Sequence, residues 1–243
     1  MIITFIYVFY VYINGGKNMC WTGIILNPYK NLFLNSIIDG IYKQMIDNPH
    51  GFFLYTIFPQ VYIRTTDITV FKKLFDEIVD LTPICMYLHF RYASAGLISL
   101  DNVHGWQIGD YYIAHNGIVT EYCIELQQQK SDTLYLIEQK EFQELLLTQQ
   151  WDKLFEFCDT KGFYGVMFIV KHDFSEIYGI SIGKPIKYHK FNNMAFITSG
   201  KFITNKCKHY IDGIFKINFK DVEKLTSISL AQIREDNTYN THL

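Results

Sequence analysis

Helical periodicity is confined to two blocks of this chain, and short apolar segments of β type lie on either side of both blocks. In the first block, Asn35–Asp47 and the residues after Asp67 repeat apolar side chains every three to four positions, as one face of a helix requires. The second block runs from Asp132 to about Phe157, with a break expected near Thr148. Helices grouped between strands, rather than alternating singly with them, favour an α+β layered fold over a parallel doubly wound sheet.

Capping residues and spacing predict where the individual elements lie. Asn35 or Ser36 is suited to cap the first helix and Asp67 the second, because short polar side chains accept hydrogen bonds from the first helical turn. The buried stripe of the second helix is expected to be Phe71, Leu74, Phe75, Ile78 and Val79. Strands are expected at Trp21–Leu26, Val61–Thr65, 84–91, 111–114, 165–171, 176–181, 186–189, 195–198, 214–218 and 226–230.

The composition is that of an ordinary folded chain with little charge bias. Apolar residues make up 49% of the 243 residues and charged residues 19%, so the chain is too apolar to be disordered and long enough for one large domain. The formal net charge is −2 and basic residues do not cluster, so nucleic acid is not an expected partner. The cysteines show no metal or redox spacing, which favours a reducing, cytoplasmic location. They are Cys20, Cys85, Cys123, Cys158 and Cys207.

The first eighteen residues differ from the rest of the chain. Residues 2–13 form an apolar run that is shorter than the about 20 residues a membrane-spanning helix needs, and no positive charge precedes it as in a secretory signal. One interpretation of this β-branched and aromatic run is an extra strand or a weak anchor. The codons of Gly15 and Gly16 can contain GGAGG, a bacterial ribosome-binding sequence, shortly before the Met19 codon. We therefore expect residues 1–18 to be an untranslated leader or a removed or disordered extension, and residues 19–243 to form a single domain with no membrane association.

Four short pieces of sequence stand out from the predicted strands and helices. Each alone has a structural explanation: Asn-Gly is a common turn dipeptide, for example, and a Ser before a helix is an ordinary N-cap. Their order along the chain is what indicates function. The pieces are Met19-Cys20-Trp21-Thr22-Gly23, the stretch 89–96 (HFRYASAG), Asp101-Asn102-Val103-His104 with His115-Asn116-Gly117, and Ser131-Asp132-Thr133.

Together these pieces resemble the class II glutamine amidotransferases. Mature chains of that family begin with Cys and then show H-x-R-x-A-S/T-x-G, N-x-H, H-N-G and S-D-T in order. The resemblance spans Cys20 to about residue 134 and continues loosely through 162–171 and 195–200. It implies a specific α+β architecture, the four-layer αββα sandwich of the N-terminal-nucleophile hydrolases, and a single glutaminase-type domain over residues 19–243.

The chain departs from the family pattern at three places, as a divergent member would. Trp21 and Thr22 intervene between the cysteine and its glycine, Gly105 stands where a proline commonly follows the N-x-H element, and the interval between Gly117 and Asp132 is short. None of these departures removes a residue that the chemistry requires.

The resemblance implies catalytic roles for three residues. Cys20 attacks the side-chain amide of the substrate, and its own α-amine, a group with a pKa of roughly 7.7–8.0, takes the thiol proton. The side-chain amide of Asn116 and the backbone N–H of Gly117 donate to the oxyanion of the tetrahedral intermediate. No separate histidine base is needed.

It also implies how glutamine or a γ-glutamyl compound is held. Arg91 binds the α-carboxylate through its planar fork, Ser94 adds a hydroxyl, and Asp132 accepts from the α-ammonium. We expect no cofactor.

A metal site built from His89, His104, His115 and Asp132 is a rival interpretation of the same pieces. Their spacing is wide and no histidine pair lies at i, i+4, as a helical metal motif would require. We therefore expect no metal, with the histidines supporting the strands and loops around the site.

Three functional hypotheses follow. The chain is a glutaminase that supplies ammonia to a separate acceptor enzyme, because residues 19–243 leave no room for an acceptor domain. Alternatively, it is a stand-alone amidohydrolase of a γ-glutamyl conjugate, or a non-catalytic relic that binds a ligand or partner. A retained segment 1–18 would favour the relic, because it blocks the α-amine of Cys20. The intact set of Arg91, Asn116, Gly117 and Asp132 argues against the relic.

Overall fold

The computed structural model describes residues 20–30, 33, 35–123, 129–191, 193–200 and 207–227. The predicted leader, residues 1–18, lies outside this set. So do residues 228–230 of the last predicted strand. Thr226 and Ser227 are not in a strand, and the prediction of a strand there is wrong for these two residues.

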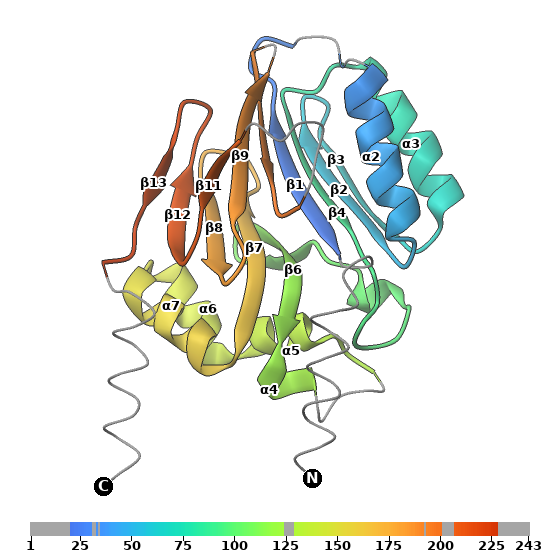
Figure 1. The fold of residues 1–243 in the computed structure, drawn as a ribbon. Coiled ribbons are helices and arrows are strands. Elements are labelled where there is room, and N and C mark those ends of the chain that lie inside the picture. Colours follow the sequence, from blue (N-terminus) through green and yellow to red (C-terminus); the bar gives the residue numbers. More distant parts are fainter. Residues whose placement is uncertain are drawn as a thin grey trace, which may run out of the picture.

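The predicted α+β class is confirmed: the strands form two antiparallel sheets with several helices packed on them (Figure 1). The larger sheet has seven strands in the order β11-β9-β10-β1-β4-β2-β3. Its strands are β1 (Trp21–Leu26), β2 (Phe52–Ile57), β3 (Val61–Thr65), β4 (Cys85–Phe90), β9 (Ile186–Phe191), β10 (Met194–Thr198) and β11 (Lys208–Tyr210). β2 is not among the strands that the sequence predicts. Five of its six residues are apolar, and so short a run has no period by which to separate a buried strand from a helix.

The second sheet has six strands in the order β13-β12-β8-β7-β6-β5. These strands are β5 (Trp106–Ile108), β6 (Tyr111–Val119), β7 (Phe163–Lys171), β8 (Ile177–Ile182), β12 (Gly213–Ile217) and β13 (Val222–Lys224). β6 is much longer than the predicted strand at 111–114, and it pairs with β7 along its whole length, from Tyr111 opposite Lys171 to Val119 opposite Phe163. This extension carries Asn116 and Gly117 into the interior of a strand.

Helices cover the outer face of each sheet (Figure 1). The apolar stripes of α2 (Asn35–Asp47) and α3 (Ile68–Asp80) pack on the seven-stranded sheet. The six-stranded sheet is covered by α5 (Asp132–Glu138), α6 (Lys140–Leu147) and α7 (Trp151–Thr160), whose apolar residues join its core. The predicted break near Thr148 is confirmed, and a second break, at Gln139, separates α5 from α6. The described residues also include two short helices, α4 (Thr120–Cys123) and the 3-10 turn Leu100–Asn102.

The inner faces of the two sheets pack against each other. A third apolar cluster contains Phe53 and Tyr87 of the larger sheet together with Val166 and Phe168 of the smaller one. The Tyr87 hydroxyl crosses this core and donates to Phe168 O (2.7 Å). Every residue of β1 and β4 is buried, so a polar side chain that a ligand can reach has to lie beyond the ends of these strands.

Among the helices that the structure describes, none is both long enough and apolar enough to cross a membrane.

The cap of α3 offers a test of the helix boundaries. Asp67 Oδ1 accepts from Thr69 N (2.7 Å) and Val70 N (3.2 Å), as the sequence predicts for an N-cap. We expect Asp67→Ala to lower the free energy of unfolding by about 1 kcal/mol, measured by urea denaturation. Asp80→Ala, at the other end of the same helix, is the control and should not lower it, because a carboxylate near a helix C-terminus is unfavourable. Equal losses in the two variants would contradict the cap.

Candidate functional site

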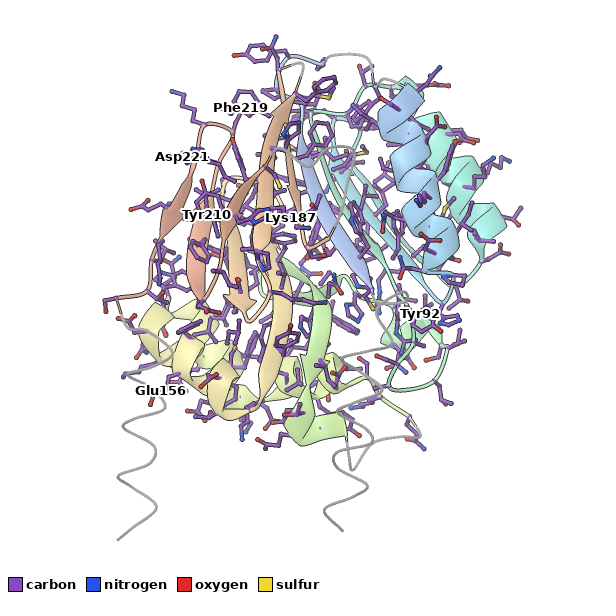
Figure 2. The ribbon with its side chains drawn as sticks, viewed as in Figure 1. Tyr92, Glu156, Lys187, Tyr210, Phe219 and Asp221 are labelled. Atoms are coloured by element: carbon purple, nitrogen blue, oxygen red, sulfur yellow. The ribbon has the colours of Figure 1, made fainter. Side chains whose placement is uncertain are left out.

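Cys20 lies directly before β1, at the end of the larger sheet where the neighbouring strand β4 finishes. Antiparallel pairing sets Trp21 opposite Phe90, so the chain beyond β4 passes Cys20 at Tyr92, which is labelled in Figure 2. Cys20 Sγ donates to Tyr92 O (3.3 Å) and accepts from Tyr92 N (3.2 Å). The backbone N–H and C=O of Tyr92 therefore both bond to the thiol.

Burial is the main influence on the Cys20 thiol and raises its pKa to about 11. The Tyr92 N–H and the positive charge of Arg91 lower this pKa, whereas the negative charge of Asp132 raises it. Arg91 and Asp132 are thus both within electrostatic range of the sulfur. At neutral pH the thiol is protonated, so it needs a base before it can act as a nucleophile.

Arg91 follows β4 directly and is buried, with only 2% of its surface exposed. Its Nη1 donates to Leu97 O (2.9 Å) and its Nη2 to Ala95 O (2.6 Å). The guanidinium thereby folds the loop after β4 back over itself, which uses part of its five-donor capacity. Burial lowers the pKa of Arg91, while the charges of Cys20 and Asp132 raise it.

Ser94 lies on the same loop and is exposed. No contact within the described residues places its hydroxyl against Cys20. The charge of Arg91 therefore acts on the thiol, whereas nothing links Ser94 to it among the described residues.

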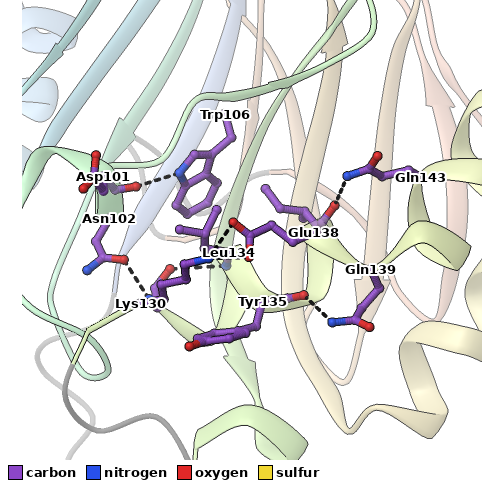
Figure 3. Close-up of polar contacts among 11 residues, drawn as sticks. Asp101, Asn102, Trp106, Lys130, Leu134, Tyr135, Glu138, Gln139 and Gln143 are labelled. Atoms are coloured by element: carbon purple, nitrogen blue, oxygen red, sulfur yellow. Dashed lines mark hydrogen bonds and ion pairs between the residues drawn. The ribbon is translucent and has the colours of Figure 1, made fainter.

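Asn102 ties this loop to α5 (Figure 3). Its Nδ2 donates to Leu97 O (3.1 Å) and Gln129 O (2.6 Å), and its Oδ1 accepts from Ser131 N (2.7 Å). One buried amide therefore links the loop beyond β4 to the residue that precedes Asp132. The sequence singled out the N-x-H element that contains Asn102, and this contact is what that residue does in the structure.

Asp132 is the first residue of α5, and its neighbour Ser131 is the N-cap, with Oγ accepting from Leu134 N. The Asp132 carboxylate is buried, and its Oδ2 accepts from Val119 N (2.7 Å) at the end of β6. Its Oδ1 accepts from Thr133 N (2.8 Å). The Asp132 carboxylate thus joins β6 to α5.

Asn116 lies in the interior of β6, not in a turn, and is buried. Its Nδ2 donates to Ser199 Oγ (2.8 Å), across the interface between the sheets. Ser199 follows β10, and its Oγ accepts from Thr22 N (3.1 Å). Asn116 is therefore connected, through one hydroxyl, to a residue two positions after Cys20.

Gly117 occupies a position that no larger residue fits. A Cβ there would lie 2.0 Å from Tyr164 O and 2.8 Å from the Cα of Gly165, both backbone atoms that cannot move aside. A glycine is needed because β7 approaches β6 so closely at this point.

The three predicted supporting histidines connect the two sheets. His89 Nε2 donates to His115 O (3.1 Å), His104 Nδ1 accepts from His115 N (3.1 Å), and the His89 and His104 rings stack with centroids 3.9 Å apart. Burial lowers the pKa of His89 and of His115 to about 3, and that of His104 well below its ordinary value, so all three are neutral at pH 7. Within the part of the chain that the structure describes, no three His, Cys, Asp or Glu side chains are grouped so as to hold a metal ion.

Two residues near the site are ones that the sequence did not single out. Burial lowers the pKa of Lys184 to about 8, and the positive charge of Lys187 acts in the same direction. The charge of Cys20 acts to raise the pKa of Lys184, so Lys184 belongs to the electrostatic surroundings of the thiol. Ser199 is the other. No local signal marks either residue, because Ser199 is 177 positions from Thr22 and Lys184 is a single lysine between two strands.

Comparison of the chain with models of protein families finds no match, and neither does a search among curated proteins.

The raised pKa of Cys20 predicts how the thiol reacts with iodoacetamide in the 243-residue chain. Only the thiolate reacts, so alkylation of Cys20 should accelerate about tenfold per pH unit from neutral pH up to its pKa of about 11. Mass spectrometry of the peptides reads each cysteine separately. Cys85, which is buried and whose pKa is raised to about 12, is the internal control and should react more slowly. A Cys20 rate that does not change between about pH 7 and 9 would show a preformed thiolate and contradict this prediction.

Proposed function

We propose that this chain is a class II glutamine amidotransferase-like amidohydrolase that releases ammonia from glutamine through a thioester on Cys20. The observation that carries the proposal is the convergence of four separate segments of the chain. The thiol of Cys20, the guanidinium of Arg91 and the carboxylate of Asp132 influence one another electrostatically. The amide of Asn116 is held beside Thr22 through Ser199. These are a nucleophile, two charged groups for an amino acid, and an oxyanion donor.

The arrangement of layers supports the same proposal. Two antiparallel sheets pack face to face and each carries helices on its outer face. We propose that this is the four-layer αββα sandwich of the N-terminal-nucleophile hydrolases, with the nucleophile at the start of β1 in the larger sheet.

The proposed reaction starts from a chain that begins at Cys20, so that its α-amine is free. The amine takes the Sγ proton as the sulfur attacks the amide carbon of glutamine, and the carbonyl electron pair moves onto oxygen. Asn116 Nδ2 and the Gly117 N–H stabilise that oxyanion, and one such donor is worth about 3–4 kcal/mol in the transition state. Ammonia leaves with the proton from the amine, and a thioester remains. Water, deprotonated by the same amine, then attacks the thioester, releases glutamate and restores the thiol.

The proposed substrate contacts use charge at both ends of the amino acid. Arg91 pairs with the α-carboxylate and Asp132 with the α-ammonium, with Ser94 on the loop after β4 as an additional hydroxyl. Arg91 and Asp132 already bind backbone groups, which fixes their side chains before substrate arrives. Preorganised charges cost little rearrangement on binding.

A further part of the proposal is a separate acceptor enzyme that receives the ammonia. Ammonia diffuses freely, so glutamine hydrolysis is productive when an acceptor is docked beside the Cys20 site. Binding of the acceptor would then accelerate turnover.

The direct test compares two forms of the chain. A chain encoded from Met19, whose initiator methionine is removed, should hydrolyse glutamine, whereas the 243-residue form should not, because its Cys20 amine is blocked in a peptide bond. Cys20→Ala in the shorter form should have no activity, and Asn116→Ala should lower kcat by about a hundredfold to a thousandfold. Equal activity of the two forms would contradict the N-terminal-amine mechanism. Activity toward a γ-glutamyl conjugate with little toward glutamine would replace the glutaminase proposal by a stand-alone γ-glutamyl amidohydrolase.

The role of Asp132 is tested with a pair of substrates. Glutaramate is glutamine without its α-amine, so wild-type protein should prefer glutamine in kcat/KM by roughly tenfold to a hundredfold, the value of a hydrogen bond to a charged group. In Asp132→Ala this preference should disappear, whatever the variant's overall activity. The comparison of two substrates on one protein separates substrate recognition from any loss of folding. A preference that survives in Asp132→Ala would remove Asp132 from the ammonium site.

A further inference from the structure

Ser199 stands where the two sheets and the start of β1 meet. It follows the last residue of β10, and its backbone N–H donates to Thr22 O (3.0 Å). Its side chain is buried, with 6% of the residue exposed, and faces Asn116 on the opposite sheet. The position arises from the pairing of β10 with β1, in which Gly23 lies opposite Thr198.

All hydrogen-bonding positions of the Ser199 hydroxyl are occupied. A serine hydroxyl has one hydrogen to donate and two lone pairs that accept. The hydrogen goes to Thr22 O (3.2 Å), and the lone pairs accept from Thr22 N (3.1 Å) and Asn116 Nδ2 (2.8 Å). The hydroxyl hydrogen of Ser199 is donated to Thr22 O, so toward Asn116 the Ser199 oxygen can only accept a hydrogen bond.

This arrangement decides which end of the Asn116 amide faces which way. With Nδ2 against Ser199, all the bonds just described form together. If the amide turned over, Oδ1 would face Ser199, and the hydroxyl would have to withdraw its hydrogen from Thr22 O, with the loss of one hydrogen bond. Asn116 Oδ1 is itself buried and has no hydrogen-bond partner among the described residues, so the carbonyl end contributes nothing to holding the amide in place.

The second hydrogen on Nδ2 is then the one that remains for a ligand. An amide nitrogen carries two hydrogens, and Ser199 accepts one of them. Oxyanion stabilisation requires N–H rather than C=O to be presented to the developing negative charge. A turned amide would present its carbonyl oxygen, which would repel that charge.

We propose that Ser199 is a positioning residue that holds the Asn116 amide in the orientation needed to stabilise an oxyanion. This role rests on the proposed function, because an oxyanion forms only if Cys20 attacks an amide. Ser199 itself acts through Asn116 and does not touch the substrate.

The test measures turnover and oxyanion binding separately in Ser199→Ala. Variants are expressed from the full coding sequence in the native host, and each is assayed on the form whose intact mass corresponds to a chain that begins at Cys20. The probe of the oxyanion site is glutamate γ-semialdehyde, which forms a tetrahedral adduct with the thiolate. Alkylation of Cys20 by iodoacetamide, which creates no oxyanion, reports on the thiol alone.

We expect Ser199→Ala to lower kcat by about tenfold to a hundredfold, less than the loss of a whole oxyanion donor, with KM changed by less than about twofold. Inhibition by the aldehyde should weaken by a similar factor, while the alkylation rate of Cys20 stays unchanged. Ser199→Thr keeps the hydroxyl and should retain most of the turnover. Thr56→Val, which removes another buried hydroxyl of the same sheet, bonded to Cys85 O, is the control and should leave kcat unchanged.

A double-mutant cycle distinguishes positioning from a general structural effect. In the Asn116→Ala background, Ser199→Ala should cause no further loss of kcat, because the residue it acts through is absent. A full additional loss in that background, or wild-type kcat in the single variant, would overturn the positioning role. If Ser199→Ala does not fold, Ser199→Cys is used in its place, because a thiol is a poor hydrogen-bond acceptor. The expected losses of kcat and of aldehyde inhibition are the same, and Ser199→Thr remains the variant that keeps the hydroxyl. If the wild-type protein does not turn over glutamine, the proposed function is overturned and this role with it. If the wild type turns over glutamine and kcat is the same in the Ser199 variants, this role alone is overturned.

Discussion

The antiparallel pairing of β1 with β4 on one side and β10 on the other is the constraint on which the site depends. In an antiparallel sheet, a strand begins where its neighbours end. Trp21 lies opposite Phe90, and Gly23 lies opposite Thr198. The residues just outside these strands therefore gather at one end of the strands, where Cys20 contacts the segment after β4 and Thr22 contacts the segment after β10. A shift of one residue in either register would turn these side chains to the other face of the sheet.

The second sheet supplies the remaining part of the site across a buried interface. Asn116 projects from the interior of β6 to Ser199, and His89 and His115 join the sheets through a side-chain-to-backbone hydrogen bond. An unpaired buried donor or acceptor costs about 1–3 kcal/mol. His89 and His115 are neutral, so they add no charge at this depth, and each bonds through one ring nitrogen. Their other ring nitrogens, His89 Nδ1 and His115 Nε2, are buried without a hydrogen-bond partner among the described residues.

Several polar residues of the site also hold the backbone together. Arg91 binds two carbonyls of the loop after β4, Asn102 links that loop to the residue before α5, and Asp132 binds the N–H at the end of β6. The loop, the helix and the strand are thereby connected by side chains that the resemblance assigns to the site or to its motifs. Such shared use makes the site rigid, and it means that substitutions at Arg91 or Asp132 affect folding as well as ligand contacts. Paired substrates and double-mutant cycles are the measurements that separate these effects.

The sequence by itself determined the elements that local periodicity defines. The boundaries of α2, the cap of α3, the strand β1, the α+β class and the order of the motif pieces all follow from patterns within a few residues. Four of the five residues predicted for the buried stripe of α3 are buried, and the fifth, Leu74, is half-buried. It did not determine β2, which is too short and too apolar to show a period, or the extension of β6 through Asn116 and Gly117, a dipeptide typical of turns. Only the tertiary structure decided that Asn116 meets Ser199, that Arg91 closes its own loop, and that Ser94 stays exposed. The physical reason is that these outcomes depend on strand register and on sheet-to-sheet packing between segments far apart in the chain, for which no local pattern of side chains carries a signal.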